Sequence, residues 1–136
     1  MPKITAYIHF ANGNCREAMA FYRDCLGGQL KLQVVKDSPM ADMFPPHLKD
    51  NILHASLENA ELTLLGSEMP SLEPEVKGHS ISLMLICDSI SELHEQFNKL
   101  SAGGKTFHPI EQFYAGTMGS FIDKFGIMWG AFTNEK

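Results

Sequence analysis

Apolar and polar residues alternate along several short stretches of the chain, and this alternation predicts strands with one buried and one open face. Residues 3–10 are the first such stretch, and residues 127–132 are the last. The apolar positions predicted to face the interior are Ile4, Ala6, Ile8, Leu53, Ala55, Leu57, Ile81, Leu83, Leu85, Ile127, Trp129 and Ala131. Successive side chains of a strand point to opposite faces, so the positions between them form a second face of different character.

Two other stretches repeat their apolar residues at spacings of three and four, as an amphipathic helix does. Asn14 and Glu17 are typical of a capping box at the start of the first, and Ser89 and Glu92 are typical of one 75 positions later. The apolar helix positions recur at the same offset, as Cys15, Ala18, Tyr22 and Cys25 and then as Ile90, Leu93, Phe97 and Leu100.

The glycines that end the two helices, Gly28 and Gly103, are also 75 positions apart. Strand, capped helix, glycine and further strands therefore follow in the same order twice. This repetition predicts two copies of a βαβββ unit, at about residues 3–66 and 79–133, within a single domain of residues 1–136.

Breaks in the pattern place the connections between these strands. Further strands are expected at residues 29–36, 51–58, 61–65, 79–87, 105–110 and 117–122, with loops at 37–50 and 111–116 and a linker at 66–78. The last two strands form a hairpin, because Asp123 favours the start of a tight turn and Gly126 its end.

Composition and charge exclude several classes of function. The net charge of −5 comes without a basic stripe, so we expect no nucleic-acid partner. No apolar run approaches the roughly 20 residues that span a bilayer, and no signal-peptide pattern is present, so we expect a cytoplasmic protein without a membrane partner. Cys15, Cys25 and Cys87 lack C-x-x-C spacing and are expected to be reduced, buried thiols.

The faces opposite the helices carry the residues that point to function. They collect Thr5, Tyr7, His9, His54, Ser56, Ser80, Ser82, Met84, Met128 and Gly130. Aromatic rings and thioethers among a few polar groups suit a half-enclosed cavity for a small molecule. Phe113 and Tyr114 are expected at its mouth, where they stack on a ligand or pack in a dimer contact.

Several runs resemble one known family over essentially the whole chain. They are Asn12-Gly13-Asn14-Cys15-x-Glu17-Ala18, Gly27-Gly28, Ile52-x-His54-Ala55 and Asp123-Lys124-Phe125-Gly126-Ile127-x-Trp129. The chain resembles the PhnB-like branch of the vicinal oxygen chelate superfamily, which includes glyoxalase I, extradiol dioxygenases and bleomycin-binding proteins. The resemblance implies an α+β glyoxalase/bleomycin resistance fold, in which tandem βαβββ modules form a curved mixed sheet with a central cavity. It also implies a homodimer.

The resemblance implies a metal site as well, with one side chain from each of four cavity strands. Carried over by strand position, these places fall on Tyr7, His54, Ser82 and Gly130. Glycine has no side chain, serine is a poor ligand for Zn²⁺, Ni²⁺ or Fe²⁺, and tyrosine ligates only when deprotonated. We therefore expect no metal and no other cofactor. A site formed by His9 and His54 is the alternative under which a divalent metal would bind.

The remaining candidates each have a structural and a functional interpretation. His54 suits a general base near neutral pH, or else it is a core histidine bonded to Tyr7 or Ser56. Cys15 lies at a helix N-terminus, where a thiol pKa can fall, but no base adjoins it in sequence, which favours a structural role. The other histidines, His47, His79, His94 and His108, are expected to be solvated.

Two functional hypotheses follow. In the first, the protein binds a small molecule without catalysis, through Tyr7, His9, His54, Ser56, Ser82, Phe113, Tyr114, Met128 and Gly130. In the second, it is a lyase, isomerase or transferase that uses His9 and His54 with a metal or His54 as a metal-free base. The absence of ligating side chains at Ser82 and Gly130 favours the first hypothesis or a metal-free enzyme.

Overall fold

The computed structural model describes residues 2–10, 13–69, 78 and 80–136. The chain forms two compact units, Met1–Glu75 and Val76–Lys136, called here the first and the second unit. The predicted linker falls largely on residues 70–77, which lie outside the described residues, as do Asn12 of the resemblance motif and His79. The single-domain organisation stays a prediction.

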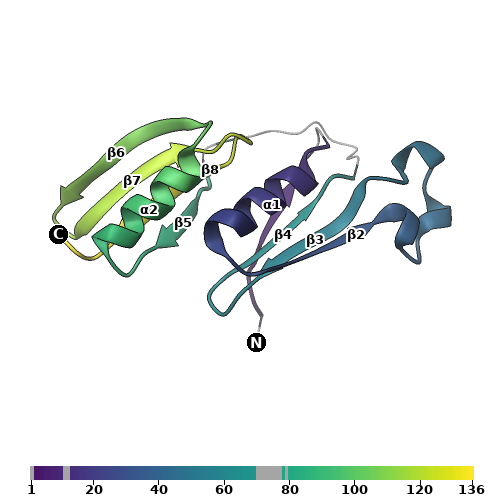
Figure 1. The fold of residues 1–136 in the computed structure, drawn as a ribbon, viewed down its shortest axis with the longest axis horizontal. Helices are drawn as coiled ribbons and strands as arrows, with labels where there is room; N and C mark the ends of the chain where they lie inside the picture. The colour runs from purple at the N-terminus through teal and green to yellow at the C-terminus, as the bar shows by residue number, and fades with distance from the viewer. Residues whose placement is uncertain (1, 11–12, 70–77, 79) are drawn as a thin grey trace. The chain divides into compact units, whose positions relative to one another are not determined.

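The first unit places one helix on a sheet of four strands (Figure 1). In the sheet order β1-β4-β3-β2, the pair β1 and β4 is parallel and the other pairs are antiparallel. The elements are β1 (Ala6–His9), α1 (Cys15–Leu26), β2 (Gln29–Val34), β3 (Ile52–Glu58) and β4 (Thr63–Ser67). Between β2 and β3 the chain makes three short 3₁₀ turns, Val35–Asp37, Ala41–Met43 and Pro46–Leu48, in a region predicted to be an irregular loop.

The second unit repeats this arrangement. Its sheet order is β5-β8-β7-β6, again with the first pair parallel and the others antiparallel. The elements are β5 (Leu83–Ile86), α2 (Ile90–Ser101), β6 (Lys105–Phe113), β7 (Gly116–Ile122) and β8 (Met128–Thr133). Two βαβββ modules, each with a mixed sheet, confirm the predicted α+β fold class. The predicted cavity bounded by both modules stays a prediction.

Each core lies between the helix and one face of its own sheet. In the first unit, Gly66 of β4 faces α1, since a Cβ added there would lie 3.2 Å from the sulfur of Met19 and 3.4 Å from that of Cys15. In the second unit, the Phe121 ring meets the Phe97 ring of α2 at 5.0 Å between centroids. Neither helix, at 12 residues, is long enough to cross a membrane, and no described helix is.

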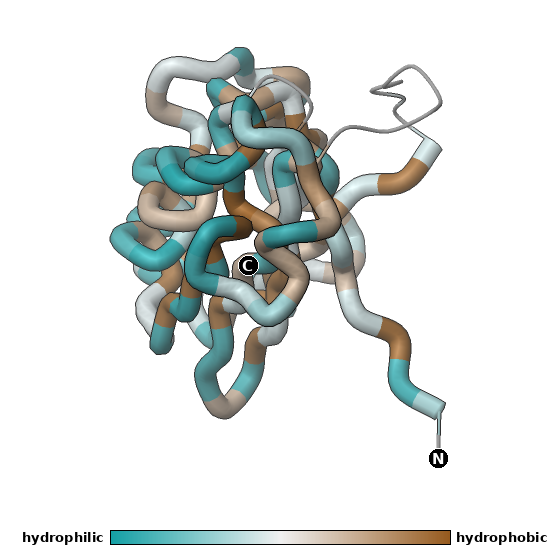
Figure 2. The backbone as a smooth tube through the Cα atoms, turned by 90° about the vertical axis from the view of Figure 1, so that its right-hand side faces the viewer, coloured by the Kyte–Doolittle hydropathy of each residue, from teal (hydrophilic) through white to brown (hydrophobic). Residues whose placement is uncertain are grey.

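The two first strands are shorter than predicted. Ile4 is 99% exposed and Ile81 is 82% exposed, because β1 begins only at Ala6 and β5 only at Leu83. In Figure 2 the N-terminal segment accordingly runs away from the strands. The assignment of Ile4 and Ile81 to the core was therefore wrong. Ile52, assigned to the open face, is fully buried beside a register shift between β2 and β3.

Two connections also differ from the prediction. The hairpin after β3 turns between Asn59 and Leu62, so its return strand is β4 at Thr63–Ser67 and not residues 61–65. The predicted loop at 111–116 is wrong. Strand β6 continues to Phe113, and only Tyr114 and Ala115 form the turn before β7.

Both helices begin against a glutamate that follows the last strand of their own unit. The Cys15 N–H donates to Glu68 Oε2 at 3.3 Å, and the Ile90 N–H donates to Glu135 Oε1 at 2.8 Å. The first residue of a helix has no intrahelical acceptor, and the helix dipole favours an anion there. Glu68 therefore does what was predicted of Asn14, whose side chain makes no capping bond.

Sequence reasoning placed the second helix start correctly. Ser89 accepts from the Glu92 N–H at 3.1 Å, and Glu92 accepts in return from the Asp88 N–H, one residue before the N-cap. A near-complete capping box thus adds to the contact from Glu135. In the first unit, Glu68 instead accepts a second hydrogen bond from the Ile52 N–H, at 2.7 Å.

The closing hairpin is organised by the buried carboxylate of Asp123, which is 2% exposed. Its Oδ1 accepts from the N–H groups of Phe125 and Ile127 at 2.8 and 3.0 Å, and its Oδ2 accepts from Trp129 Nε1 at 2.9 Å. Gly126, at φ 87°, adopts the left-handed conformation that the end of this turn requires. These contacts explain what the residue types and spacing of the Asp-x-Phe-Gly-Ile-x-Trp run do in this fold.

Replacing Glu68 by Gln should destabilise the protein by about 2 kcal/mol, because a buried amide group would face two backbone donors that now share a carboxylate. Glu135→Gln is the matched control, since Glu135 is exposed and Ser89 caps α2 independently. We expect it to cost less than half as much in urea unfolding. Equal effects of the two variants would contradict this role of Glu68.

Replacing Asp123 by Ala should cost about 3 kcal/mol or more, because three buried donors lose their acceptor. Asp88→Ala, at an exposed site of the same unit, is expected to change stability by about 0.5 kcal/mol at most. Urea unfolding followed by tryptophan fluorescence measures both. If both variants unfold at the wild-type midpoint, the turn does not depend on Asp123.

Candidate functional site

The open face of the first sheet, opposite α1, carries an aromatic cluster formed by Tyr7, His9 and His54. The Tyr7 and His9 rings stack with centroids 4.9 Å apart, and the Tyr7 and His54 rings are tilted at 5.8 Å. The Tyr7 hydroxyl lies 3.4 Å from His54 Nδ1, at the long end of a hydrogen bond. The side chains of Tyr7, His9 and His54 are all exposed, so a phenol and two imidazoles are available to a ligand.

Strand register explains how these residues meet although 47 positions separate Tyr7 from His54. Tyr7 pairs with Leu65 of β4, and Leu65 pairs with Ser56 of β3. His54 lies two residues from Ser56 on the same strand and therefore on the same face. The Tyr7 side chain thus reaches across β4 toward β3. Of the predicted residues, the structure brings Tyr7, His9 and His54 together and places Ser56 beside them.

The other predicted ligand contacts belong to the second unit. Gly130 lies between Met84 of β5 and Ser120 of β7 in the sheet register. A Cβ added to Gly130 would lie 2.7 Å from Met84 Cε and 3.0 Å from its sulfur. The thioether of Met84 thus occupies the space that a side chain at position 130 would need. Met128, two residues before Gly130, is half-buried on the same face.

The remaining three predicted contacts are more peripheral. Phe113 is half-buried, and its ring meets the rings of Phe132 and Tyr114 edge-on at 5.9 and 5.4 Å. Tyr114, at 89% exposure, projects from the turn, and Ser82 is exposed just before β5. The ligand-binding roles of these residues stay predictions.

Sequence reasoning missed Ser120, which is 92% buried on the same face as Gly130. The pairing of Ser120 with Gly130 depends on the hairpin register, which the turn residues alone do not fix. Glu68 and Glu135 were missed for another reason, since no local pattern links them to the helices that they cap.

The donor set does not fit a metal of the kind that the resemblance implies. Of the four corresponding positions, only His54 carries a strong ligand, and Met84 fills the space at Gly130. Within the described residues, no three His, Cys, Asp or Glu side chains form a group that could hold a metal ion. The chemistry of this face is therefore that of phenol, imidazole and hydroxyl groups. That the protein binds no metal and no other cofactor stays a prediction.

Neither cysteine with a perturbed pKa is suited to nucleophilic chemistry. Burial, with a smaller effect of the Glu68 carboxylate, raises the pKa of the Cys15 thiol from 9.0 to about 12. Burial likewise raises the pKa of Cys87 to about 11, with Glu92 and Asp88 adding to the effect. The structural role favoured for Cys15 agrees with this, because the Glu68 carboxylate offsets the lowering expected at a helix N-terminus.

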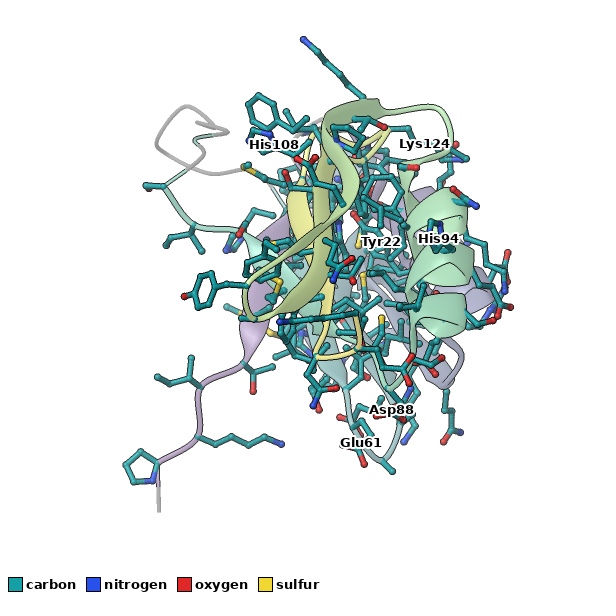
Figure 3. All side chains as sticks on the ribbon, turned by 90° about the vertical axis from the view of Figure 1, so that its left-hand side faces the viewer. Tyr22, Glu61, Asp88, His94, His108 and Lys124 are labelled. Atoms are coloured by element: carbon teal, nitrogen blue, oxygen red, sulfur yellow. The ribbon has the colours of Figure 1, made fainter. Side chains whose placement is uncertain are left out.

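The other described histidines belong to other elements of the chain. His47 is exposed in a 3₁₀ turn of the first unit. In the second unit, His94 is exposed on α2 and His108 on β6 (Figure 3).

Comparison with known proteins identifies the class to which this architecture belongs. The family model of the glyoxalase/bleomycin resistance protein/dioxygenase superfamily matches residues 5–130. The chain belongs to this superfamily, as its sequence resemblance predicted.

Individual proteins similar to this chain give the extent of the similarity. The chain is 29% identical to Protein YjdN of Escherichia coli K12 over 93% of its own length and 91% of that protein. It is similar to the crystal structure of protein PA1353 from Pseudomonas aeruginosa, with a TM-score of 0.83, 31% identity and coverage of 98% of this chain and 100% of that one. A PhnB protein from Bacillus cereus shares the fold, with a TM-score of 0.72, 20% identity and coverage of 97% and 99%.

The Cys15 thiol gives a pH dependence of stability with a definite sign. Its pKa is raised in the folded state, so the folded protein holds the proton between about pH 9 and 12 while the unfolded chain releases it. This contribution is complete below pH 9 and is lost as pH rises through that window. The free energy of unfolding of the wild type should therefore fall more steeply between pH 8.5 and 10.5 (about 1 kcal/mol per unit) than that of Cys15→Ala. Parallel curves would contradict the shift.

Proposed function

We propose that this protein binds a small polar or aromatic molecule without a metal, anchored on Tyr7, His9 and His54. The observation that carries the proposal is the contact of a phenol with two imidazoles on an exposed sheet face, at 3.4 Å for Tyr7 and His54 and 4.9 Å for the Tyr7–His9 stack. Such a cluster offers both aromatic surface for stacking and polar groups that fix the orientation of a ligand.

The choice of residue types supports a binding role over a packing role. A histidine kept only for the core would be buried, with both ring nitrogens satisfied inside the protein. His54 is instead exposed and has its Nδ1 near one partner, Tyr7, whose hydroxyl is 47 positions away in the chain. Ser56 adds a hydroxyl on the same face, and Ser82, Phe113, Tyr114, Met128 and Gly130 are the proposed contacts from the second unit.

A metal-free enzyme is the second candidate, and the Tyr7–His54 contact is what favours it. A neutral imidazole that accepts a proton from a substrate carbon or oxygen acts as a general base, and a tyrosine hydroxyl beside it can donate to a developing oxyanion. In this candidate, His54 is the base and Tyr7 is the hydrogen-bond donor.

The assembly and location follow from the superfamily and the composition. We propose a homodimer that acts in the cytoplasm. Cys15 and Cys87 are free thiols, and all three cysteines are buried, as is usual in a reducing compartment. Exposed apolar side chains at Ile4 and Ile81 are available for a contact between copies.

A thermal-shift screen with small phenols, aromatic acids and purines tests the binding proposal, followed by calorimetric titration of the compound that stabilises most. We expect His54→Ala to weaken binding about tenfold and Tyr7→Phe about threefold, as for the loss of one or two hydrogen bonds. His94→Ala, exposed on α2, is the control and should bind as the wild type does.

Two results would contradict the proposal. The first is a screen in which every stabilising compound binds wild type and His54→Ala equally well. The second is a stoichiometric divalent metal in protein purified without chelator that is absent from His54→Ala, since this would support a metal enzyme instead. Turnover of a bound compound that stops in His54→Ala would favour the enzyme candidate.

A further inference from the structure

The open face of the second sheet, opposite α2, is markedly apolar and partly exposed. Register places Met84 beside Gly130, and it places Ile86 and Met118 beside Phe132. Met84 is 49% exposed and Ile86 is 65% exposed, while Met118 and Phe132 are half-buried. Three methionines, counting Met128, give this face a flexible, polarisable lining that adapts to the shape of a ligand.

The polar residues beside this face in the register, His108 and Glu111 of β6, are exposed, whereas the hydroxyl of Ser120 is buried within it. Phe121 points toward α2, because its ring meets Phe97 of that helix, and a Cβ added to Gly119 would also point at Phe97. Ser120, between them, therefore points to the open face. It is 8% exposed, and its hydroxyl oxygen is buried without a hydrogen-bond partner among the described residues.

An unpartnered buried hydroxyl has an energetic cost that a ligand can remove. On folding, Ser120 Oγ loses its hydrogen bonds to water, and no described group replaces them. Ser120 lies between Gly130 of β8 and His108 of β6 in the register, and the flexible end of Met84 occupies the space beside Gly130. If the Met84 side chain rotates, the glycine leaves room for a flat group beside the hydroxyl.

We propose that this face binds a flat, neutral aromatic molecule with a carbonyl group, whose oxygen accepts a hydrogen bond from Ser120 while its ring lies over Gly130 among the methionines. A neutral acceptor is favoured because Glu111 lies beside Met118 in the register and disfavours an anion. The inference rests on the proposed function in using Met128 and Gly130 as ligand contacts, and it adds the specificity residue and the ligand class.

The test is a pair of probes of nearly equal shape, acetophenone and ethylbenzene, of which only the first carries a carbonyl. Full-length protein with isotope-labelled methionine methyl groups is titrated with each probe and followed by NMR. We expect the methyl signals of Met84, Met118 and Met128 to shift. In Ser120→Ala the affinity for acetophenone should fall about fivefold, while that for ethylbenzene changes less than twofold.

Stability of the free protein provides a second readout. Ser120→Ala should melt at or above the wild-type temperature, because it removes a buried hydroxyl without a partner. Ser67→Ala is the matched control: its hydroxyl is also buried but accepts from the Met69 N–H at 3.2 Å, so its loss should lower the melting temperature. A lower melting temperature in Ser120→Ala would show that Ser120 has a partner in the fold and would overturn the proposal.

The binding outcomes separate this inference from the proposed function. If Ser120→Ala lowers the affinity for both probes equally, or changes the affinity for neither, the inference is overturned. The effect of His54→Ala on the binding of its own ligands still stands in either case. Methyl signals that neither probe shifts would overturn it in favour of a face covered by protein. If His54→Ala binds its ligands as the wild type does while Ser120→Ala loses affinity for acetophenone only, the anchoring role of the aromatic cluster is overturned and this inference stands.

Discussion

In each unit a carboxylate that follows the last strand binds the first N–H of the helix, and in the first unit this carboxylate also binds the start of β3. Glu68 reaches the Cys15 N–H and Glu135 reaches the Ile90 N–H, so a chain segment that has just left the sheet fixes where the helix begins. The helix is thereby kept against one face of the sheet. Among the described residues of each unit, no helix or strand covers the opposite face, and this is where both candidate sets of functional residues lie.

The two open faces have the same topology but different chemistry. Tyr7, His9 and His54 give the first face stacked rings and exchangeable protons, whereas Met84, Met118 and Met128 give the second face thioethers and one buried hydroxyl. A repeated module thus presents polar groups on one face and apolar groups on the other, and both kinds of group are used in small-molecule sites. The helix-facing positions of both modules remain apolar, because they must fill a core.

The sequence predicted the features that depend on local periodicity and turn residues. It failed where contacts between residues far apart in the chain determine the structure. The offset of 75 positions predicted the repeated module, and Asp123 and Gly126 predicted the turn, because both signals are local. Ile4 and Ile81 continue the alternation of their strands beyond the last ladder pair, so alternation alone placed them in the core. The Asn14 cap failed because Glu68, 54 positions later, binds the same helix end.

The side chain of Met84 fills the space beside Gly130, and this changes how the glycine is interpreted. A glycine at a ligand position could in principle mark a site from which a side chain was simply lost. Here the space is used, since Met84 Cε would lie 2.7 Å from a Cβ at position 130. A carboxylate at this place would require Met84 to move and would enter an apolar face, where an unpaired charge is costly. The strand that follows the Asp123–Gly126 turn therefore presents a surface suited to a ring, and the polar contact comes from Ser120 on the neighbouring strand.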